Sequence, residues 1–257
     1  TEFAIPKKEI DEYVDALLEG GLETALQRVV AHYTPKRDKV EAELRELAKK
    51  APVMFMVPVQ LQDHKGRPIA QIGSLEDDLD GRVVYQISQN MKFEDIFLRQ
   101  VMNALVDRYA LDAAKLLQYL YKSPVFENSK RGILQRGLQS YFAGDALCAL
   151  HLLIPQIEDA VRNLVELVGG TVLKLGRGGG LHLRTLDELL RDEQVKRVLG
   201  EDVSLYLRVL LTDQRGINLR NNVCHGISPE KSFNIALADR VIHAILILAQ
   251  VRKKVEN

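Results

Sequence analysis

Apolar residues recur at helical spacing through the first fifty residues. A first stripe runs through Ile10, Val14 and Leu17 and ends at the glycine pair 20–21. A second segment covers residues 22–33, and a third opens after Pro35. Apolar positions three and four residues apart fall on one face of a helix. The pattern therefore predicts three short amphipathic helices.

The pattern changes between residues 52 and 73. The run from Val53 to Leu61 is rich in strand-forming residues, and the run from Ile69 to Ile72 can return beside it. A turn-forming stretch, 63–66, separates the two. We predict a β-hairpin in which Pro58 marks an edge or a bulge, because proline has no N–H to donate to a sheet. His64 would be a solvent-exposed residue of its turn.

Helical periodicity returns from Leu98 to Lys122 and stops at Ser123-Pro124. Two further helices are expected at 128–143 and 145–168. Asp145 should cap the second of them, and glycines 169–170 should close it. Pro155 should kink or split that helix, because it removes a backbone hydrogen bond.

The last third of the chain mixes small elements with one very apolar helix. Residues 171–184 predict a second, smaller hairpin around a glycine-rich tip. Thr185 and Glu188 form a capping box for a short helix. The segment 233–254 is apolar nearly all round, so we expect a central core helix or part of a dimer seam. His243 within it is expected to be a hydrogen-bonded core residue.

These elements predict a mainly α fold. We place a helical region with a small β-hairpin at 1–124 and a helical domain at 125–257.

Composition narrows the classes of function. Lys+Arg and Asp+Glu both number 35, so the net charge is zero and any contact with nucleic acid has to be local. The two cysteines, Cys148 and Cys224, favour a reducing compartment without disulfides, and we expect the cytoplasm. The apolar run 241–249 is too short to cross a bilayer. The sequence starts at Thr1 rather than methionine, which is consistent with a fragment of a longer protein.

The densest group of candidate chemical residues lies between 215 and 225. Its centre, residues 220–225, reads R-N-N-V-C-H and is followed by Gly226. Histidine titrates near neutrality, and arginine offers a planar fork that matches phosphate oxygens. Because no acid follows Asp213 in this segment, we expect neither a metal nor another cofactor there.

Spacing sets a geometric condition on this group. Asn218, Asn221, Asn222 and His225 follow i, i+3, i+4, i+7 and would share one helix face. Arg220 is five positions from His225, so an ideal helix turns the two apart. They can converge if the arginine stem wraps round, if the helix is distorted, or if two subunits each supply one. Gly226 is expected to end the helix as its C′ residue.

The R-N-x-x-x-H signature resembles that of a family of uncharacterised domains that includes the endoplasmic-reticulum-membrane-associated RNA degradation proteins. It is also similar to the R-x(4–6)-H motif of the HEPN superfamily of helical ribonucleases and toxins. An upstream block fits the first family: residues 137–145, G-L-Q-S-Y-F-A-G-D, followed by 151–162, H-L-L-I-P-Q-I-E-D-A-V-R. The resemblance covers about 130–257.

The resemblance implies a HEPN-like helical bundle in the C-terminal half and metal-independent endoribonuclease activity, of the kind found in toxins and defence proteins. His225 would be the general acid or base, Arg220 would hold the phosphate, and Asn221 would position one of these groups. Glu158 would orient the cluster, with Arg162 as its partner and Asn218 and Asn222 in support. RNA would be the partner, and two subunits would pair their motifs in a homodimer.

Other interpretations compete with this one. The motif can be structural within a non-catalytic helical scaffold or an RNA- or nucleotide-binding module, and zero net charge with 6% aromatic residues favours this slightly. Glu158 and Arg162 can be an ordinary i, i+4 surface pair. Cys224 next to His225 suggests a thiol dyad, but adjacent helical residues point about 100° apart. A small buried cysteine is the simpler expectation.

Overall fold

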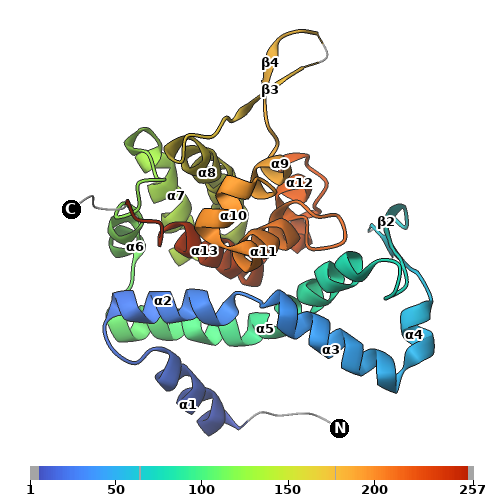
Figure 1. The fold of residues 1–257 in the computed structure, drawn as a ribbon. Helices are drawn as coiled ribbons and strands as arrows, with labels where there is room; N and C mark the ends of the chain where they lie inside the picture. Colours follow the sequence, from blue (N-terminus) through green and yellow to red (C-terminus); the bar gives the residue numbers. More distant parts are fainter. Residues whose placement is uncertain (1–5, 64, 177, 254–257) are drawn as a thin grey trace. The chain divides into compact units, whose positions relative to one another are not determined.

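The computed structural model describes residues 6–63, 65–176 and 178–253, which form helices joined by turns and two small β-hairpins (Figure 1). The mainly α prediction is confirmed. His64, placed in the first turn by the sequence, lies outside the described residues. The longer helices are α1 (Lys7–Leu17), α2 (Leu22–Tyr33), α3 (Arg37–Lys50), α5 (Leu79–Tyr109), α6 (Ala113–Leu120), α7 (Arg131–Phe142), α8 (Ala146–Leu167), α11 (Glu201–Leu211) and α13 (Ile235–Leu248). The shorter elements are α4 (Pro52–Met56), α9 (Leu186–Leu190), α10 (Glu193–Leu199), α12 (Leu219–Cys224), β1 (Val59–Gln62), β2 (Pro68–Ile72), β3 (Leu173–Leu175), β4 (Leu181–Leu183) and two 3₁₀ turns, Asn128–Lys130 and Glu230–Ser232.

The chain divides into two compact units that alternate along the sequence. Unit 1 combines residues 1–33, 94–167 and 228–257, whereas unit 2 combines 34–93 and 168–227. Helix α5 is continuous and gives its first half to unit 2 and its second half to unit 1. The boundary expected between residues 124 and 125 falls inside unit 1, between α6 and α7, which contact each other.

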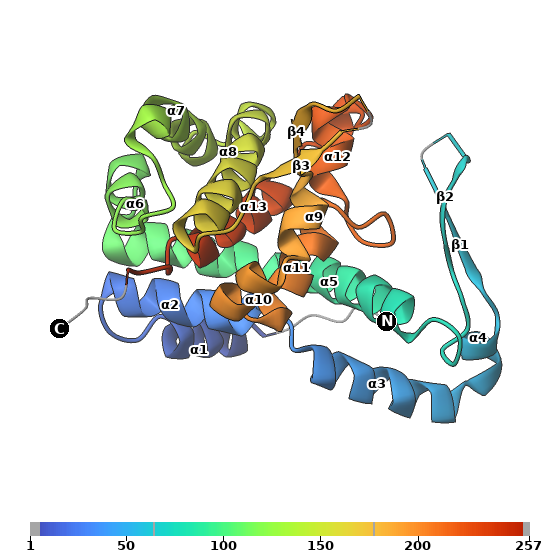
Figure 2. The same ribbon diagram turned by 45° about the horizontal axis from the view of Figure 1, so that its top comes forward.

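The core of unit 1 is built around α13, which contacts α8 and α2 (Figure 2). Every residue from Ala238 to Leu248 is buried, which confirms the expectation of a core helix. The helix is shorter at both ends than the predicted 233–254, and Asn234 caps its start by accepting a bond from the Leu237 amide. His243 is fully buried, and its Nε2 lies 3.4 Å from the carbonyl oxygen of Val30.

Helix α8 has the predicted cap, and it continues without a break past Pro155. The Asp145 carboxylate accepts a hydrogen bond from the Cys148 amide, and Gly169 follows the helix with φ +76°. Pro155 lies inside one continuous helix, so the alternative of a split helix is wrong. Helix α7 approaches α8 closely at Gly137, where a Cβ atom would lie 2.5 Å from Leu153 Cδ2. A larger residue at this position would have to displace the Leu153 side chain.

Unit 2 contains both hairpins, and one of them is shorter than predicted. Residues 52–56 form a helix rather than the first part of a strand. Pro52 occupies the first helical turn, where its fixed φ favours a helix and its missing N–H is not needed. Strand β1 begins only after Pro58 and pairs antiparallel with β2, with an irregularity between Leu61 and Gln62.

The second hairpin and the helix after it match their predictions. Strands β3 and β4 pair antiparallel, as the sequence indicated for residues 171–184. Thr185 and Glu188 form the expected reciprocal capping box at the start of α9. Helices α9 and α10 contact α11, which leads into the motif.

Candidate functional site

The chain enters the motif through a tight turn after α11. The Ile217 amide donates to the Val209 carbonyl oxygen at 2.8 Å, which folds the turn back onto the helix. A Cβ atom on Gly216 would lie 2.4 Å from that same oxygen, so the turn requires glycine. Asn218 then adopts a left-handed conformation with φ +54°, which asparagine tolerates better than most residues. The turn fixes where α12 begins.

Helix α12 is shorter than the spacing argument assumed. It covers only Leu219–Cys224, and the pair Leu219 and Val223 anchors it by pointing inward. Asn218 is the N-cap and His225 the C-cap, so the expectation that both lie on one continuous helical face is wrong. The turn forced by Gly216 ends the preceding segment, so the helix begins one residue after Asn218.

The end of α12 is a Schellman motif, with Gly226 as its C′ residue as predicted. The Gly226 amide donates to Val223 and the Ile227 amide to Asn222, both through carbonyl oxygens, while Gly226 has φ +64°. This arrangement holds His225 at the last position before the chain reverses. The side chain of His225 is exposed.

Three predicted site residues are joined by hydrogen bonds. Arg220 Nη1 donates to Asn221 Oδ1 at 3.2 Å, and Asn221 Nδ2 donates to Asn218 Oδ1 at 2.7 Å. Asn221 Nδ2 also lies 3.4 Å from the Thr212 carbonyl oxygen. Asn222 is held separately, through a 3.2 Å bond from its Nδ2 to the Ile217 carbonyl oxygen. The asparagines therefore fix the backbone around a half-buried guanidinium.

Cys224 is exposed, so the prediction of a small buried cysteine is wrong. It is the last residue of a six-residue helix that is anchored through Leu219 and Val223, and its position points away from that anchoring face. Cys224 and His225 are adjacent and both exposed.

Glu158 and Arg162 form an ion pair on α8. The Glu158 side chain is 8% exposed and that of Arg162 is 23% exposed, so this is not an ordinary surface pair. Helix α8 belongs to unit 1 and α12 to unit 2. The suggestion that Glu158 orients the motif stays a prediction.

A network of charged residues in unit 2, which the sequence reading missed, supports the turn before the motif. Arg215 contacts both oxygens of Asp213 and also Asp80, while Arg208 contacts Asp213. Arg37 reaches Asp80 at 3.0 Å. Burial raises the pKa of Asp213, but the bonds from Arg215 lower it more, so the net direction is down. Arg208, Asp213 and Arg215 are close in sequence, but Asp80 and Arg37 are far from them, so spacing gave no signal for those two.

Two members of the network, Asp213 and Arg215, line a surface groove of about 510 Å³. Its lining residues come from β2, α9 and the turn after α11: Ala70, Gln71, Asp187, Arg191, Thr212, Asp213, Gln214 and Arg215. Arg191 is paired with Asp187 at 2.7 Å, and Arg215 is paired as described. The cations of the groove are therefore already neutralised by carboxylates within it.

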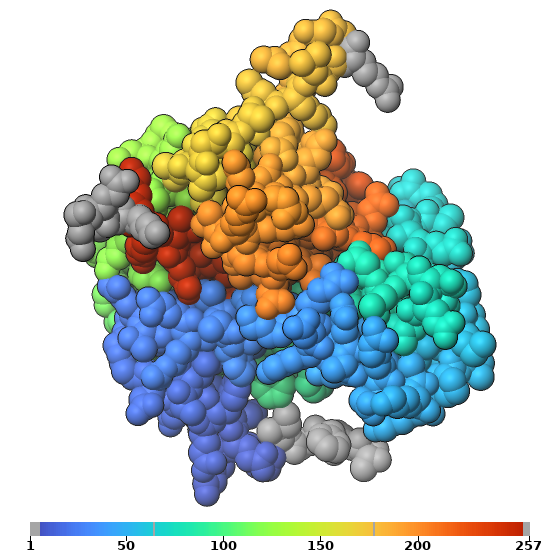
Figure 3. Space-filling model, viewed as in Figure 1, coloured from blue at the N-terminus to red at the C-terminus, as the bar shows by residue number. Residues whose placement is uncertain are grey.

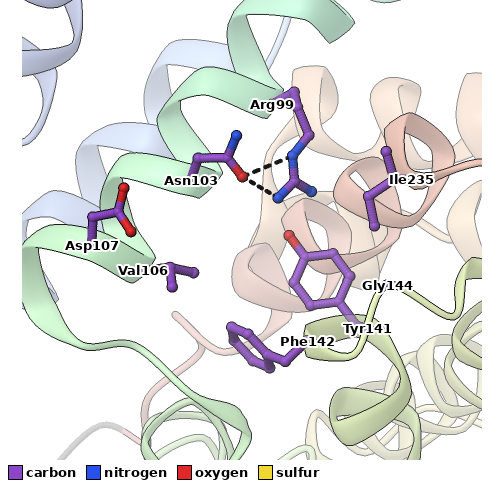
Figure 4. A pocket seen from close by; sticks show the side chains of 8 residues that line it. All are labelled: Arg99, Asn103, Val106, Asp107, Tyr141, Phe142, Gly144 and Ile235. Carbon is purple, nitrogen blue, oxygen red and sulfur yellow. Dashed lines mark hydrogen bonds between the residues drawn. The ribbon is translucent and has the colours of Figure 1, made fainter.

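Unit 1 contains a second polar centre beside a pocket of about 340 Å³ (Figure 4). Arg99 lies in its wall, bonded to Asn103 and, through Nη1 at 2.8 Å, to the fully buried Asp239. The Tyr141 hydroxyl donates to the same Asp239 oxygen at 2.6 Å. Burial raises the pKa of Asp239 to about 6, although Tyr141 and Arg99 act in the opposite direction. These residues lie on α5, α7 and α13, and sequence spacing alone gave no reason to expect contact among the three helices.

The described ranges contain no cluster of three or more His, Cys, Asp or Glu side chains suited to a metal ion. No helix within them is both long enough and apolar enough to cross a membrane.

Comparison of the chain with protein-family models, with curated proteins and with solved structures finds no match.

Proposed function

We propose that this protein is a metal-independent endoribonuclease of the HEPN type, with its site at residues 218–225. The proposal rests on the resemblance of the R-N-x-x-x-H signature and on one structural observation. The guanidinium of Arg220 is held by Asn221 on the short helix α12, whose C-cap is the exposed His225. An arginine and an exposed imidazole carried by one short helix and its cap suit a substrate with a phosphodiester and a transferable proton.

In this proposal the nucleophile is the ribose 2′-hydroxyl of the RNA itself. His225 takes its proton, or gives one to the 5′-leaving oxygen, as a general base or acid. Arg220 stabilises the charge that develops on the phosphate oxygens. Asn221 fixes the guanidinium, while Asn218 and Asn222 hold the turn and the helix end that carry it. The products are a 2′,3′-cyclic phosphate and a 5′-hydroxyl.

The proposal includes a homodimer in the cytoplasm. Arg220 and His225 lie five positions apart, at the start of α12 and at its C-cap. Pairing of two motifs would let the arginine of one copy act with the histidine of the other. The two cysteines, Cys148 and Cys224, suit a reducing compartment. Toxin or defence function and the supporting roles of Glu158 and Arg162 come from the resemblance alone.

The test is cleavage of a mixed RNA panel with EDTA present. Wild-type protein should cleave RNA, leave cyclic phosphate ends and fail on substrates whose 2′-hydroxyls are replaced by hydrogen. His225→Ala should lower the rate by about 10²–10⁴-fold, the usual effect of losing a general acid or base. Arg220→Lys should also be poorly tolerated, because a point charge does not reproduce the fork.

Cys224→Ser is the matched control, because it changes the exposed neighbour of His225 and should leave cleavage intact. Thermal melting of His225→Ala should shift little, since the ring is exposed. A clear loss of stability without any RNA phenotype would contradict the proposal. It would instead support a structural role for the motif in a non-catalytic scaffold, which the bonds from Asn221 and Asn222 to backbone carbonyls favour.

A further inference from the structure

The groove of about 510 Å³ in unit 2 adjoins the motif. It is lined by residues of β2, of α9 and of the turn after α11. Figure 3 shows the β1–β2 hairpin, in cyan, beside the orange segment that carries this turn. Thr212 connects the groove to the motif, because its carbonyl oxygen lies 3.4 Å from Asn221 Nδ2. Asn221 in turn accepts a hydrogen bond from Arg220.

The charged side chains that line the groove are already committed to one another. Arg191 Nε donates to Asp187 Oδ2 at 2.7 Å, and the Thr212 hydroxyl donates to Asp187 Oδ1 at 2.9 Å. Arg215 donates to both oxygens of Asp213. The two arginines therefore offer no net charge to a phosphate. Each carboxylate oxygen already has a donor, so the aspartates do not favour an amine or a metal ion. The groove selects an uncharged group.

Two polar side chains of the groove remain available to such a group. Gln71 and Gln214 are exposed, and neither carboxamide bonds another residue in the part of the chain that the structure describes. A carboxamide presents a donor and an acceptor side by side, which is the arrangement that pairs with N6 and N7 of adenine.

The groove also offers a flat surface. Asp187 holds the guanidinium of Arg191 by its edge, and the Arg191 side chain is 48% exposed. Unstacked RNA bases stack on guanidinium planes of this kind. A planar, uncharged ligand with a hydrogen-bonding edge therefore matches both the arginine and the two glutamines, and a nucleobase has this chemistry.

We propose that this groove binds a base of single-stranded RNA, preferentially adenine, next to the bond that is cut at the motif. The assignment rests on the ribonuclease function proposed above and adds the part of the substrate that is read. Arg220 holds the phosphate, and the groove holds the base beside it. Gln71 and Gln214 determine specificity and take no part in proton transfer. Single-stranded RNA is the substrate form, because its bases can leave the stack and enter a groove.

The first measurement maps cut sites in a randomised RNA pool that is incubated with the whole chain and EDTA. The 5′-hydroxyl products are sequenced, and the bases on both sides of the cut are compared with those of the uncut pool. Adenine should be enriched at least about fivefold at one flanking position, the lower end of what a bidentate carboxamide–adenine pair provides. Gln71→Leu with Gln214→Leu should remove the enrichment while cleavage of the pool continues.

The second measurement does not depend on cleavage. Fluorescence anisotropy compares the binding of deoxyadenosine and deoxycytidine oligomers of equal length, which lack the 2′-hydroxyl that the reaction uses. The parent chain should bind the deoxyadenosine oligomer at least about fivefold more tightly. The variant Gln71→Leu with Gln214→Leu should bind the two oligomers alike.

Gln62→Leu with Gln194→Leu is the matched control, because it makes the same exchange at two exposed glutamines of unit 2 that do not line the groove. It should keep the parental preference in both measurements. Thermal melting of both double variants should match that of the parent, since all four glutamines are exposed.

The outcomes separate this assignment from the ribonuclease proposal. Cleavage without an adenine preference would overturn the groove assignment alone, and so would a preference that Gln71→Leu with Gln214→Leu leaves intact. Adenine binding that depends on the two glutamines, without any cleavage, would support the groove and overturn the ribonuclease proposal. A chain that neither cleaves RNA nor distinguishes the two oligomers would overturn both.

Discussion

Asp213 in unit 2 and Asp239 in unit 1 are both buried carboxylates in contact with an arginine, yet their pKa values move in opposite directions. The pKa of Asp213 is lowered, whereas that of Asp239 is raised to about 6. Both carboxylates lose water on folding. They differ in how deeply they are buried, since Asp239 is fully enclosed, and in how many donors replace that water.

Asp213 has both oxygens satisfied. Its Oδ1 accepts from the amide and Nε of Arg215, and its Oδ2 accepts from Arg215 Nη2 and Arg208 Nη2. Asp239 receives both of its bonds, from Arg99 and Tyr141, on Oδ1. Its Oδ2 is buried without a hydrogen-bond partner among the described residues. In this chain a neighbouring arginine keeps the pKa of a buried carboxylate low where both oxygens have donors, and does not where one oxygen has none.

The largest effect is expected for Asp213→Asn. It leaves Arg208, whose side chain is 10% exposed, without its nearest carboxylate, and breaking such a pair costs about 3 kcal/mol at neutral pH. A lowered pKa means that the contribution of Asp213 is present above the ordinary value near 4 and is lost as pH falls through the lowered one. Urea denaturation at several pH values should show that the difference in unfolding free energy between Asp213→Asn and the parent becomes smaller in acid. Asp38→Asn, at an exposed site of α3, is the control, and equal stability of Asp213→Asn and the parent would refute the account.

Tyr141→Phe should have an intermediate effect. It removes one of the two donors to Asp239, and a hydrogen bond to a charged group contributes about 2 kcal/mol. The pKa of Asp239 should rise further, because the lost donor favoured the charged form. Urea denaturation should therefore show a larger deficit above pH 7 than near pH 5, where Asp239 is protonated. A deficit independent of pH would mean that Tyr141 acts through packing alone.

Asp239→Asn should change stability least at neutral pH, by about 1 kcal/mol or less, because Asn still offers Oδ1 to Arg99 and Tyr141. Its signature is a lost pH dependence. Asp239 holds its proton in the folded chain up to about pH 6 but only to its ordinary pKa near 4 when unfolded. The stability it contributes is therefore present below about pH 4 and lost as pH rises toward 6, with an amplitude of about 3 kcal/mol.

The loss of unfolding free energy between about pH 4 and 6 should be absent in urea titrations of the Asp239→Asn protein. A slope equal to that of the parent would show that another group titrates there. Asp107→Asn, at an exposed position in the same unit, should keep the parental slope.

Periodicity predicted most of the helices, since α2, α7, α8 and α13 follow apolar stripes or capping residues that are local in sequence. Periodicity failed where a single proline or glycine determined where a helix begins. Pro52 starts a helix inside a run of strand-forming residues, and Gly216 shortens α12 by forcing a turn before it. The interleaving of the two units had no local signal, because a contact such as Arg215–Asp80 joins residues 135 positions apart.

The motif was predicted in part. Gly226 ends the helix as expected, and Asn218, Asn221 and Arg220 are joined. Asn218 and His225 became caps rather than helical residues, because tertiary anchoring through Leu219 and Val223 fixed a shorter helix. The networks at Asp213 and Asp239 depend on side chains brought together by folding, and sequence spacing carries no information about them.

The alternation of the two units also bears on how the chain folds as it leaves the ribosome. Helix α2 emerges early, but its partner α13 follows some two hundred residues later, as the 213-position separation of Val30 and His243 shows. Unit 2 likewise waits for residues 168–227 before α5 gains its partners there. The apolar face of α2 thus stays uncovered until residues 235–248 have been made. Folding should be slow, and until residues 235–248 have been made the nascent chain should depend on chaperones that shield that face.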